Sequence, residues 1–201
     1  MPEADHSASV GTAVRRKRDI LDVAERLLAT YGYDALRLRH VSQAAGVSIG
    51  LIQHYFGTRD DLLRETMRVA SERRAQQWKK LGEKEISPID KLMALIEGAI
   101  GDHHRCVIWL ETCAAATRHV ELLPAVRATQ HTWQQIIVEA LTAGIRDQTL
   151  SPDLPCDQTA ELLIRLIDGF ILEDAVGDSS KKERQRRRVA LVVGARRILG
   201  T

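Results

Sequence analysis

Side chains that suit contacts with nucleic acid are concentrated between positions 37 and 59 of the 201-residue chain. Gln53 can bond an adenine edge with both ends of its amide, and Ile49 can contact a thymine methyl group. Other polar side chains nearby can reach phosphate oxygens or a guanine edge. The expected outward set is Ile49, Gly50, Leu51, Gln53, His54 and Tyr55, with Arg37, Arg39 and Arg59 beside it. These residue types indicate a surface that reads a DNA groove.

Two short helices joined by a glycine turn would hold this surface in place. Apolar residues recur at helical spacing on both sides of Gly46, which predicts helices over 38–45 and 48–55. Gly46 can end the first helix in a conformation that costs little only for glycine, and Ser48 can cap the second. The residues expected to pack inward are Leu38, Val41, Ala44, Ala45, Val47, Ile52 and Phe56. Such a unit is a helix-turn-helix.

Three other interpretations compete with this one. The first is a small helical domain with a chance glycine turn, but a short helix gains nothing by exposing both Ile49 and Leu51. The second is an enzyme, but the chain has no glycine-rich phosphate loop and no H-E-x-x-H sequence. The third is an architectural DNA-binding protein, for which a formal net charge of +2 is low. A non-catalytic, sequence-specific DNA-binding protein is therefore expected.

The rest of the chain is also predicted to be helical, so the expected fold class is all-α. Aromatic residues make up only 4% of the chain, and helix-forming residues dominate. Gly32 is expected to end the first helix, a capping box of Thr58 and Asp61 to begin the fourth, and Ser87 to cap the fifth. Besides the two short helices, the predicted ranges are 13–31, 58–81, 88–101, 104–117, 121–148, 157–176 and 180–199.

The chain is expected to have three parts. Residues 1–12 are small and polar without periodicity, which predicts a flexible tail. Residues 13–58 make the predicted helix-turn-helix domain. Residues 59–201 make a linking helix and a larger helical bundle, with a charged break at 82–87.

Composition narrows the class of protein further. No apolar stretch is long enough to span a membrane, and the N-terminus lacks the apolar run of a secretion signal. The three cysteines, Cys106, Cys113 and Cys156, lack C-x-x-C spacing, which fits a reducing cytoplasm. The spacing of histidines and cysteines matches no structural zinc pattern, so neither a metal nor a cofactor is expected.

Residues 41–63 read V-S-Q-A-A-G-V-S-I-G-L-I-Q-H-Y-F-G-T-R-D-D-L-L and resemble the N-terminal signature of TetR-type regulators. The most specific part is H-Y-F followed by a basic residue and an acidic-Leu-Leu helix start. The resemblance implies a homodimeric repressor that binds a palindromic operator and leaves it when a small-molecule effector enters the larger domain. It adds Ser48 to the DNA-facing positions. Ile49 and Leu51 depart from the Lys and Thr frequent in the family, which leaves the base preference open.

A second, shorter resemblance concerns the C-terminal part. Residues 166–170, L-I-D-G-F, are similar to a phrase in the branch that contains choline-responsive repressors of betaine synthesis. In TetR-type proteins the last two helices pair across a two-fold axis. The resemblance therefore implies dimer contacts at Leu166, Asp168, Gly169, Phe170 and Leu191.

An effector site is expected on the helix over 104–117 and on the helix that follows. Trp109, Glu111 and Cys113 lie on the first, and Trp133 lies on the second. A tryptophan face with a carboxylate can hold a cation. The alternative is that these residues are ordinary core.

The basic residues over 181–188 also have two interpretations. They form either a second nucleic-acid patch or the solvated face of the last helix.

Overall fold

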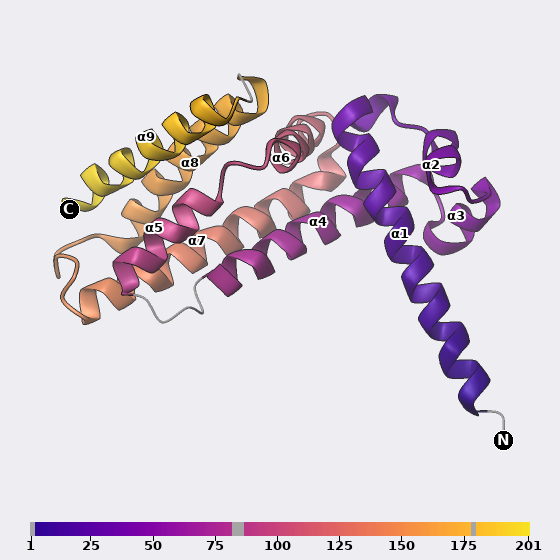
Figure 1. Ribbon diagram of the computed structural model, residues 1–201, viewed down its shortest axis with the longest axis horizontal. Helices are drawn as coiled ribbons and strands as arrows, with labels where there is room; N and C mark the ends of the chain where they lie inside the picture. The colour runs from indigo at the N-terminus through magenta and orange to yellow at the C-terminus, as the bar shows by residue number, and fades with distance from the viewer. Residues whose placement is uncertain (1–2, 82–86, 178–179) are drawn as a thin grey trace. The chain divides into compact units, whose positions relative to one another are not determined.

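The computed structural model describes residues 3–81, 87–177 and 180–201, and within these ranges every regular element is helical (Figure 1). The all-α prediction is therefore confirmed. The predicted break at 82–87 lies outside the described residues except for Ser87. The α-helices are α1 (Glu3–Ala35), α2 (Leu38–Ala45), α3 (Ile49–Phe56), α4 (Arg59–Leu81), α5 (Pro88–Gly98), α6 (His103–Ala116), α7 (Leu123–Arg146), α8 (Cys156–Val176) and α9 (Lys181–Leu199), with a 3-10 turn at Val120–Leu122.

Cap residues begin several helices where the sequence predicts. The Asp61 amide donates to the Thr58 hydroxyl, and the Thr58 amide donates to the Asp61 carboxylate, both at 3.1 Å, so the capping box of α4 is formed. The Ser87 hydroxyl accepts from the Asp90 amide at 3.2 Å at the start of α5. These bonds satisfy amide groups that a helix start leaves without partners.

Residues 3–12, which the sequence predicts as a flexible tail, belong to helix α1, which begins at Glu3. No proline follows Pro2 in this segment, and extending a helix that is already packed costs much less than nucleating a new one. Gly32 does interrupt the helix, with φ 72° and ψ 169°, but helical residues continue to Ala35.

The chain divides into two compact units, one up to Ala70 and one from Ser71. The first includes the beginning of α4, because Leu62, Leu63 and Met67 are buried there. The helix-turn-helix unit therefore extends beyond the predicted boundary at 58. Its core also contains Ile20, Leu28, Tyr33, Leu36, Val41 and Ile52.

The second unit is a helical bundle in which α8 contacts α6, α7 and α9, while α5 contacts α7 and α9. A buried ion pair joins Arg187 of α9 to Asp174 of α8 at 2.9 Å, and the Gly101 amide donates to the same carboxylate at 3.0 Å. Figure 1 shows α8 and α9 lying side by side. In the part of the chain that is described, no helix is both long and apolar enough to cross a membrane.

Candidate DNA interface and effector region

The turn between α2 and α3 has the geometry of a helix-turn-helix. Gly46 has φ 64° and ψ 32°, the left-handed region that favours glycine. The Ser42 hydroxyl donates to the Val47 carbonyl at 2.6 Å, and the Ser48 hydroxyl accepts from the Leu51 amide at 3.2 Å. The letters of 46–50, G-V-S-I-G, also match a hydrolase nucleophile elbow, which needs a preceding strand. Here the segment joins two helices, and Ser48 is a helix cap.

Helix α3 presents one face to solvent and one to the core. Ile52 is fully buried, whereas Ile49 is 41% exposed. Ser48, Gly50, Gln53 and His54 are exposed, and Leu51 and Tyr55 are half-buried. The structure therefore brings the predicted α3 residues together on one accessible surface. Of the residues expected to pack inward, Val41 is buried, Leu38, Ala45, Val47 and Phe56 are half-buried, and Ala44 is exposed, contrary to prediction.

The beginning of α2 is held by His40, which sequence reasoning did not single out. The Arg37 amide donates to His40 Nδ1 at 3.2 Å, and the Tyr31 ring stacks on the His40 ring with centroids 4.6 Å apart. Arg37 and Arg39 are both exposed, and the Arg37 guanidinium also bonds the Asp34 carbonyl. The sequence did contain a signal for this role of His40: it is a histidine at the third position of a helix, with an aromatic residue upstream.

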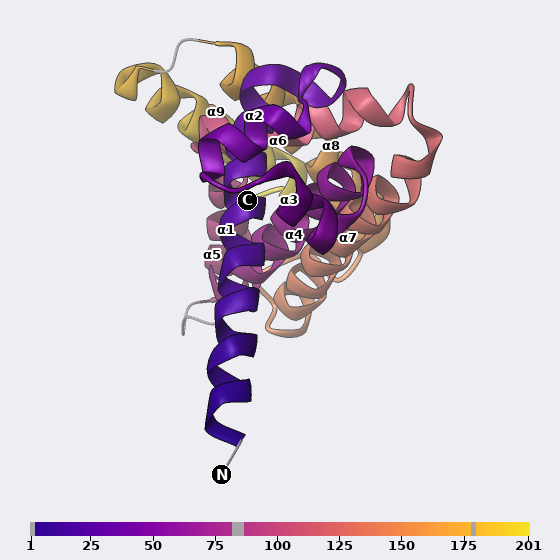
Figure 2. The ribbon, with the colours of Figure 1, turned by 90° about the vertical axis from the view of Figure 1, so that its right-hand side faces the viewer.

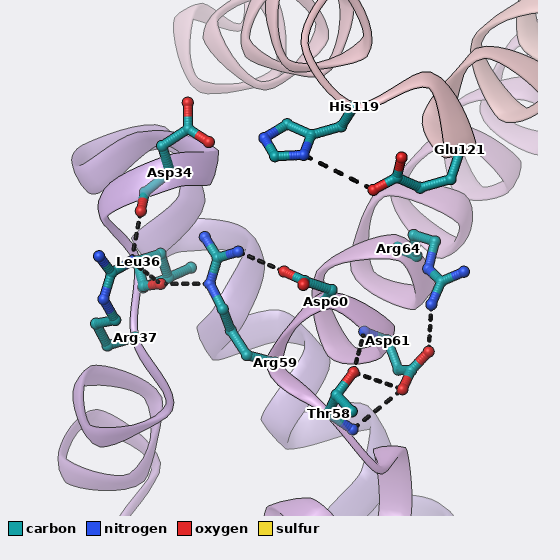
Figure 3. Close-up of polar contacts among 10 residues, drawn as sticks. All are labelled: Asp34, Leu36, Arg37, Thr58, Arg59, Asp60, Asp61, Arg64, His119 and Glu121. Atoms are coloured by element: carbon teal, nitrogen blue, oxygen red, sulfur yellow. Dashed lines mark hydrogen bonds and ion pairs between the residues drawn. The ribbon is translucent and has the colours of Figure 1, made fainter.

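Arg59 lies where the sequence places it, at the start of α4, but its guanidinium is engaged within the unit. Nε donates to the Leu36 carbonyl at 2.8 Å, and Nη1 pairs with Asp60 (Figure 3). The guanidinium carbon also lies 4.9 Å from the Tyr33 ring centroid. A phosphate contact by Arg59 would require it to give up part of this arrangement.

The capping box at the start of α4 also changes the pKa of its carboxyl group. The pKa of Asp61 is lowered, first by the hydrogen bonds from Thr58 and then by the charge of Arg64. Figure 3 shows Thr58 and Arg64 on the two oxygens of this carboxylate. Asp61 is therefore an anion that fixes the start of α4.

Two buried tryptophans lie together in the second unit. The Trp109 and Trp133 rings are 4.7 Å apart between centroids and tilted by 47°. The Arg74 guanidinium of α4 lies 4.7 Å from the Trp133 centroid and donates to the Ala99 carbonyl at 2.6 Å. Burial lowers the pKa of Arg74 to about 10. A cation of the chain itself thus already occupies the tryptophan face on which an effector was expected from the sequence.

Arg74 is the main residue of this region that sequence reasoning missed. It follows Leu63, Met67 and Ala70 at helical spacing, so a charged residue in an apolar stripe was the available signal. Within the described residues, Arg74 forms no ion pair with a carboxylate. Its charge is offset instead by a carbonyl dipole and an aromatic face.

The other predicted effector residues, Glu111 and Cys113, lie on α6. Asp168 of α8, predicted as a dimer residue, interacts with both Trp109 and Cys113. Burial raises the pKa of Asp168, an effect opposed by a hydrogen bond from Trp109 and the charge of Arg165. Burial and Asp168 raise the pKa of the Cys113 thiol to about 11, so this thiol is protonated at neutral pH. Glu111 and Cys113 are half-buried. No group of metal-ligating side chains occurs within the described ranges.

The predicted dimer residues are divided between the surface and the interior. Gly169 is exposed, and Leu166, Asp168 and Phe170 are half-buried. Leu191 of α9 is fully buried within its own chain, so its side chain offers no exposed surface for a dimer contact. The exposed apolar residues of these two helices are Leu162, Leu172, Val176, Val189 and Val193.

Comparisons with known proteins agree with this geometry. Residues 20–66 match the model of bacterial regulatory proteins of the tetR family, and residues 88–195 match that of the BetI-type transcriptional repressor C-terminal domain. The chain is 25% identical over 169 residues to the HTH-type transcriptional repressor AcnR of Corynebacterium glutamicum, covering 82% of this chain and 85% of that protein. It is 22% identical to the HTH-type transcriptional regulator PksA of Bacillus subtilis, covering 79% and 78%.

Solved structures show the same fold. A TetR-family regulator from Rhodococcus sp. is 25% identical, with a TM-score of 0.77 and coverage of 92% of this chain and 99% of that one. A regulator from Saccharomonospora viridis in complex with choline is 22% identical, with a TM-score of 0.79 and coverage of 89% and 94%.

The fold and the α2–α3 surface define a DNA-binding transcriptional regulator, a class without catalytic activity. With both parts of the chain matched by family models, the protein belongs to the TetR family.

Proposed function

We propose that this protein is a homodimeric repressor that binds a palindromic operator and is released from it by a small-molecule effector. The observation that carries this proposal is the exposed face of α3 on a capped glycine turn. Relatives named as transcriptional repressors support it. Such a protein acts in the cytoplasm, where the DNA lies.

In this proposal α3 enters the major groove, and its exposed side chains read the bases. Gln53 bonds an adenine edge and Ile49 contacts a thymine methyl group. Arg37 and Arg39 bind phosphates from the start of α2. The remaining proposed contacts are Ser48, Gly50, Leu51, His54 and Tyr55. Arg59 contributes mainly by holding the start of α4 against Leu36, in the connection between α1 and α2.

The homodimer would form through α8 and α9. Leu162, Gly169, Leu172 and Val176 follow one another at helical spacing on an exposed face of α8, and α9 exposes two valines. An added Cβ at Gly169 meets nothing within 4 Å, so the chain itself does not require glycine there. Glycine within a helix costs about 0.5–1 kcal/mol relative to alanine, and close approach of a second helix offsets that cost.

The effector would be a cation that competes with Arg74 for the Trp133 face. The choline complex of a regulator with a similar fold supports this class of ligand. Arg74 lies on α4, the helix that begins in the DNA-binding unit. Its displacement would therefore shift α4, whose beginning packs in the DNA-binding unit.

Selection of binding sites from random DNA with the full-length protein tests the function, and a palindrome bound by a dimer is expected. Recovery of no specific sequence would refute it. Choline and tetramethylammonium, followed by tryptophan fluorescence and operator release, test the effector class. Arg74→Met should bind these cations more tightly, because an internal competitor is removed. Equal affinity of the variant and the wild type would rule out the competition.

A further inference from the structure

A run of four cationic residues, Arg15, Arg16, Lys17 and Arg18, lies on α1. We call it the basic turn. It precedes residues 20–66, the segment that the family model matches. Arg15, Arg16 and Arg18 are exposed, and none of them forms an ion pair with a residue that the structure describes. Their function is therefore assigned neither by the family signature nor by a contact within the unit.

Lys17 fixes where the basic turn lies. Its Nζ is 3.5 Å from the Glu65 carboxylate of α4 and 5.4 Å from the ring centroid of Phe56, the last residue of α3. The basic turn is thus held beside the C-terminal end of the helix that carries the reading surface. Successive residues of a helix are rotated by about 100°, so Arg16 and Arg18 project on opposite sides of Lys17, and Arg15 points away from it.

Most of the described side chains between positions 12 and 19 of α1 are exposed. Figures 1 and 2 both show it projecting beyond α2 and α3. Like charges at i and i+3 of a helix, as in Arg15 and Arg18, repel each other. A polyanion that follows the surface of the unit would remove this repulsion, whereas the described residues of the unit supply an acidic partner only to Lys17.

From these observations we infer that the basic turn is an accessory contact with the sugar-phosphate backbone of duplex DNA flanking the bases read by α3. Guanidinium groups suit this partner, since their paired N–H groups match phosphate oxygens. The contact carries no base information, so it raises affinity for every sequence alike. This inference rests on the proposed DNA binding.

The test compares two triple variants of the full-length protein. The first is Arg15→Gln, Arg16→Gln and Arg18→Gln. The matched control is Lys181→Gln, Lys182→Gln and Arg186→Gln, which removes the same charge from exposed positions of α9. Affinities for the selected operator and for random duplex DNA are measured over a series of salt concentrations.

The first variant should bind both DNAs more weakly. Its slope of log affinity against log salt concentration should be smaller by about 0.9 for each phosphate that the arginines no longer neutralise. The control should keep the wild-type slope. Replacing the same three arginines by lysine should also keep it, because the charges remain.

An unchanged slope in the first variant would overturn the inference, as would an equal decrease in the control, which would reveal only a net-charge effect. If the wild-type protein bound no DNA, the proposed function itself would fail. Helicity and melting of each variant check that folding is intact, which is expected because the replaced side chains are exposed.

Discussion

At the scale of single residues, Gln53 has the clearest reading role. It is exposed on α3, one position after the fully buried Ile52 that anchors this helix. Gln53→Ala should weaken operator binding by about 1–3 kcal/mol and leave random DNA unaffected, because the substitution removes only the bonds to a base. Titrating both DNAs at one salt concentration measures the difference. Equal losses on the two DNAs would mean that Gln53 does not read a base.

Arg59 has a different role from the one its sequence position predicts. Its hydrogen bond to Leu36 and its contact with the Tyr33 ring should make Arg59→Met less stable by about 1–3 kcal/mol. The measurement is denaturant unfolding of the full chain. Arg64→Met, at an exposed ion pair, is the control and should change stability by less than about 1 kcal/mol. If Arg59→Met were as stable as the wild type and its DNA affinity depended less on salt concentration, the result would support a phosphate contact by Arg59 instead.

Asp168 supplies a pH dependence. Burial raises the pKa of Asp168 in the folded protein above the ordinary value of 3.8, so folding favours the protonated carboxyl group. The resulting contribution to the stability of the fold is fully present when the pH is below 3.8. It is lost as the pH rises through the folded-state pKa. Asp168→Asn keeps the shape without the charge, so its stability relative to the wild type should increase with pH. Melting curves from about pH 4 to pH 8 check this, and a constant difference would contradict it.

At the scale of elements, local signals predicted the helices well and tertiary partners poorly. Ser48, Thr58 and Ser87 act on amides only three residues away, so the sequence already contains what sets those helix starts. The burial of Arg74 depends on partners distant in sequence, Ala99 and Trp133, and that of Leu191 depends on how α9 packs in the bundle. The start of α1 was missed for a different reason, because its first turns have no apolar periodicity.

The turn between α2 and α3 tests the role of backbone conformation. Gly46→Ala adds a Cβ that meets nothing within 4 Å, so only its positive φ of +64° opposes the change. Stability should fall by about 1–2 kcal/mol, and operator affinity with it, since this conformation is strained for residues other than glycine. Gly46→Asn should lose less, because asparagine tolerates this region better. Equal losses for the two variants would point to a cause other than φ.

At the scale of the whole molecule, reading a palindrome requires two copies of α3, so the proposed α8–α9 surface should control DNA binding. Gly169→Leu fills the space that the second copy is proposed to need. It should not destabilise the chain, because leucine favours the helix and a Cβ there meets nothing within 4 Å.

Light scattering should therefore show more monomer for Gly169→Leu, and operator affinity should fall while affinity for a single half-site changes little. Ala114→Leu adds the same side chain at an exposed position of α6 and should remain dimeric. If Gly169→Leu stayed dimeric with full operator affinity, the two copies would have to meet elsewhere, and the exposed apolar residues of α8 and α9 would need another partner.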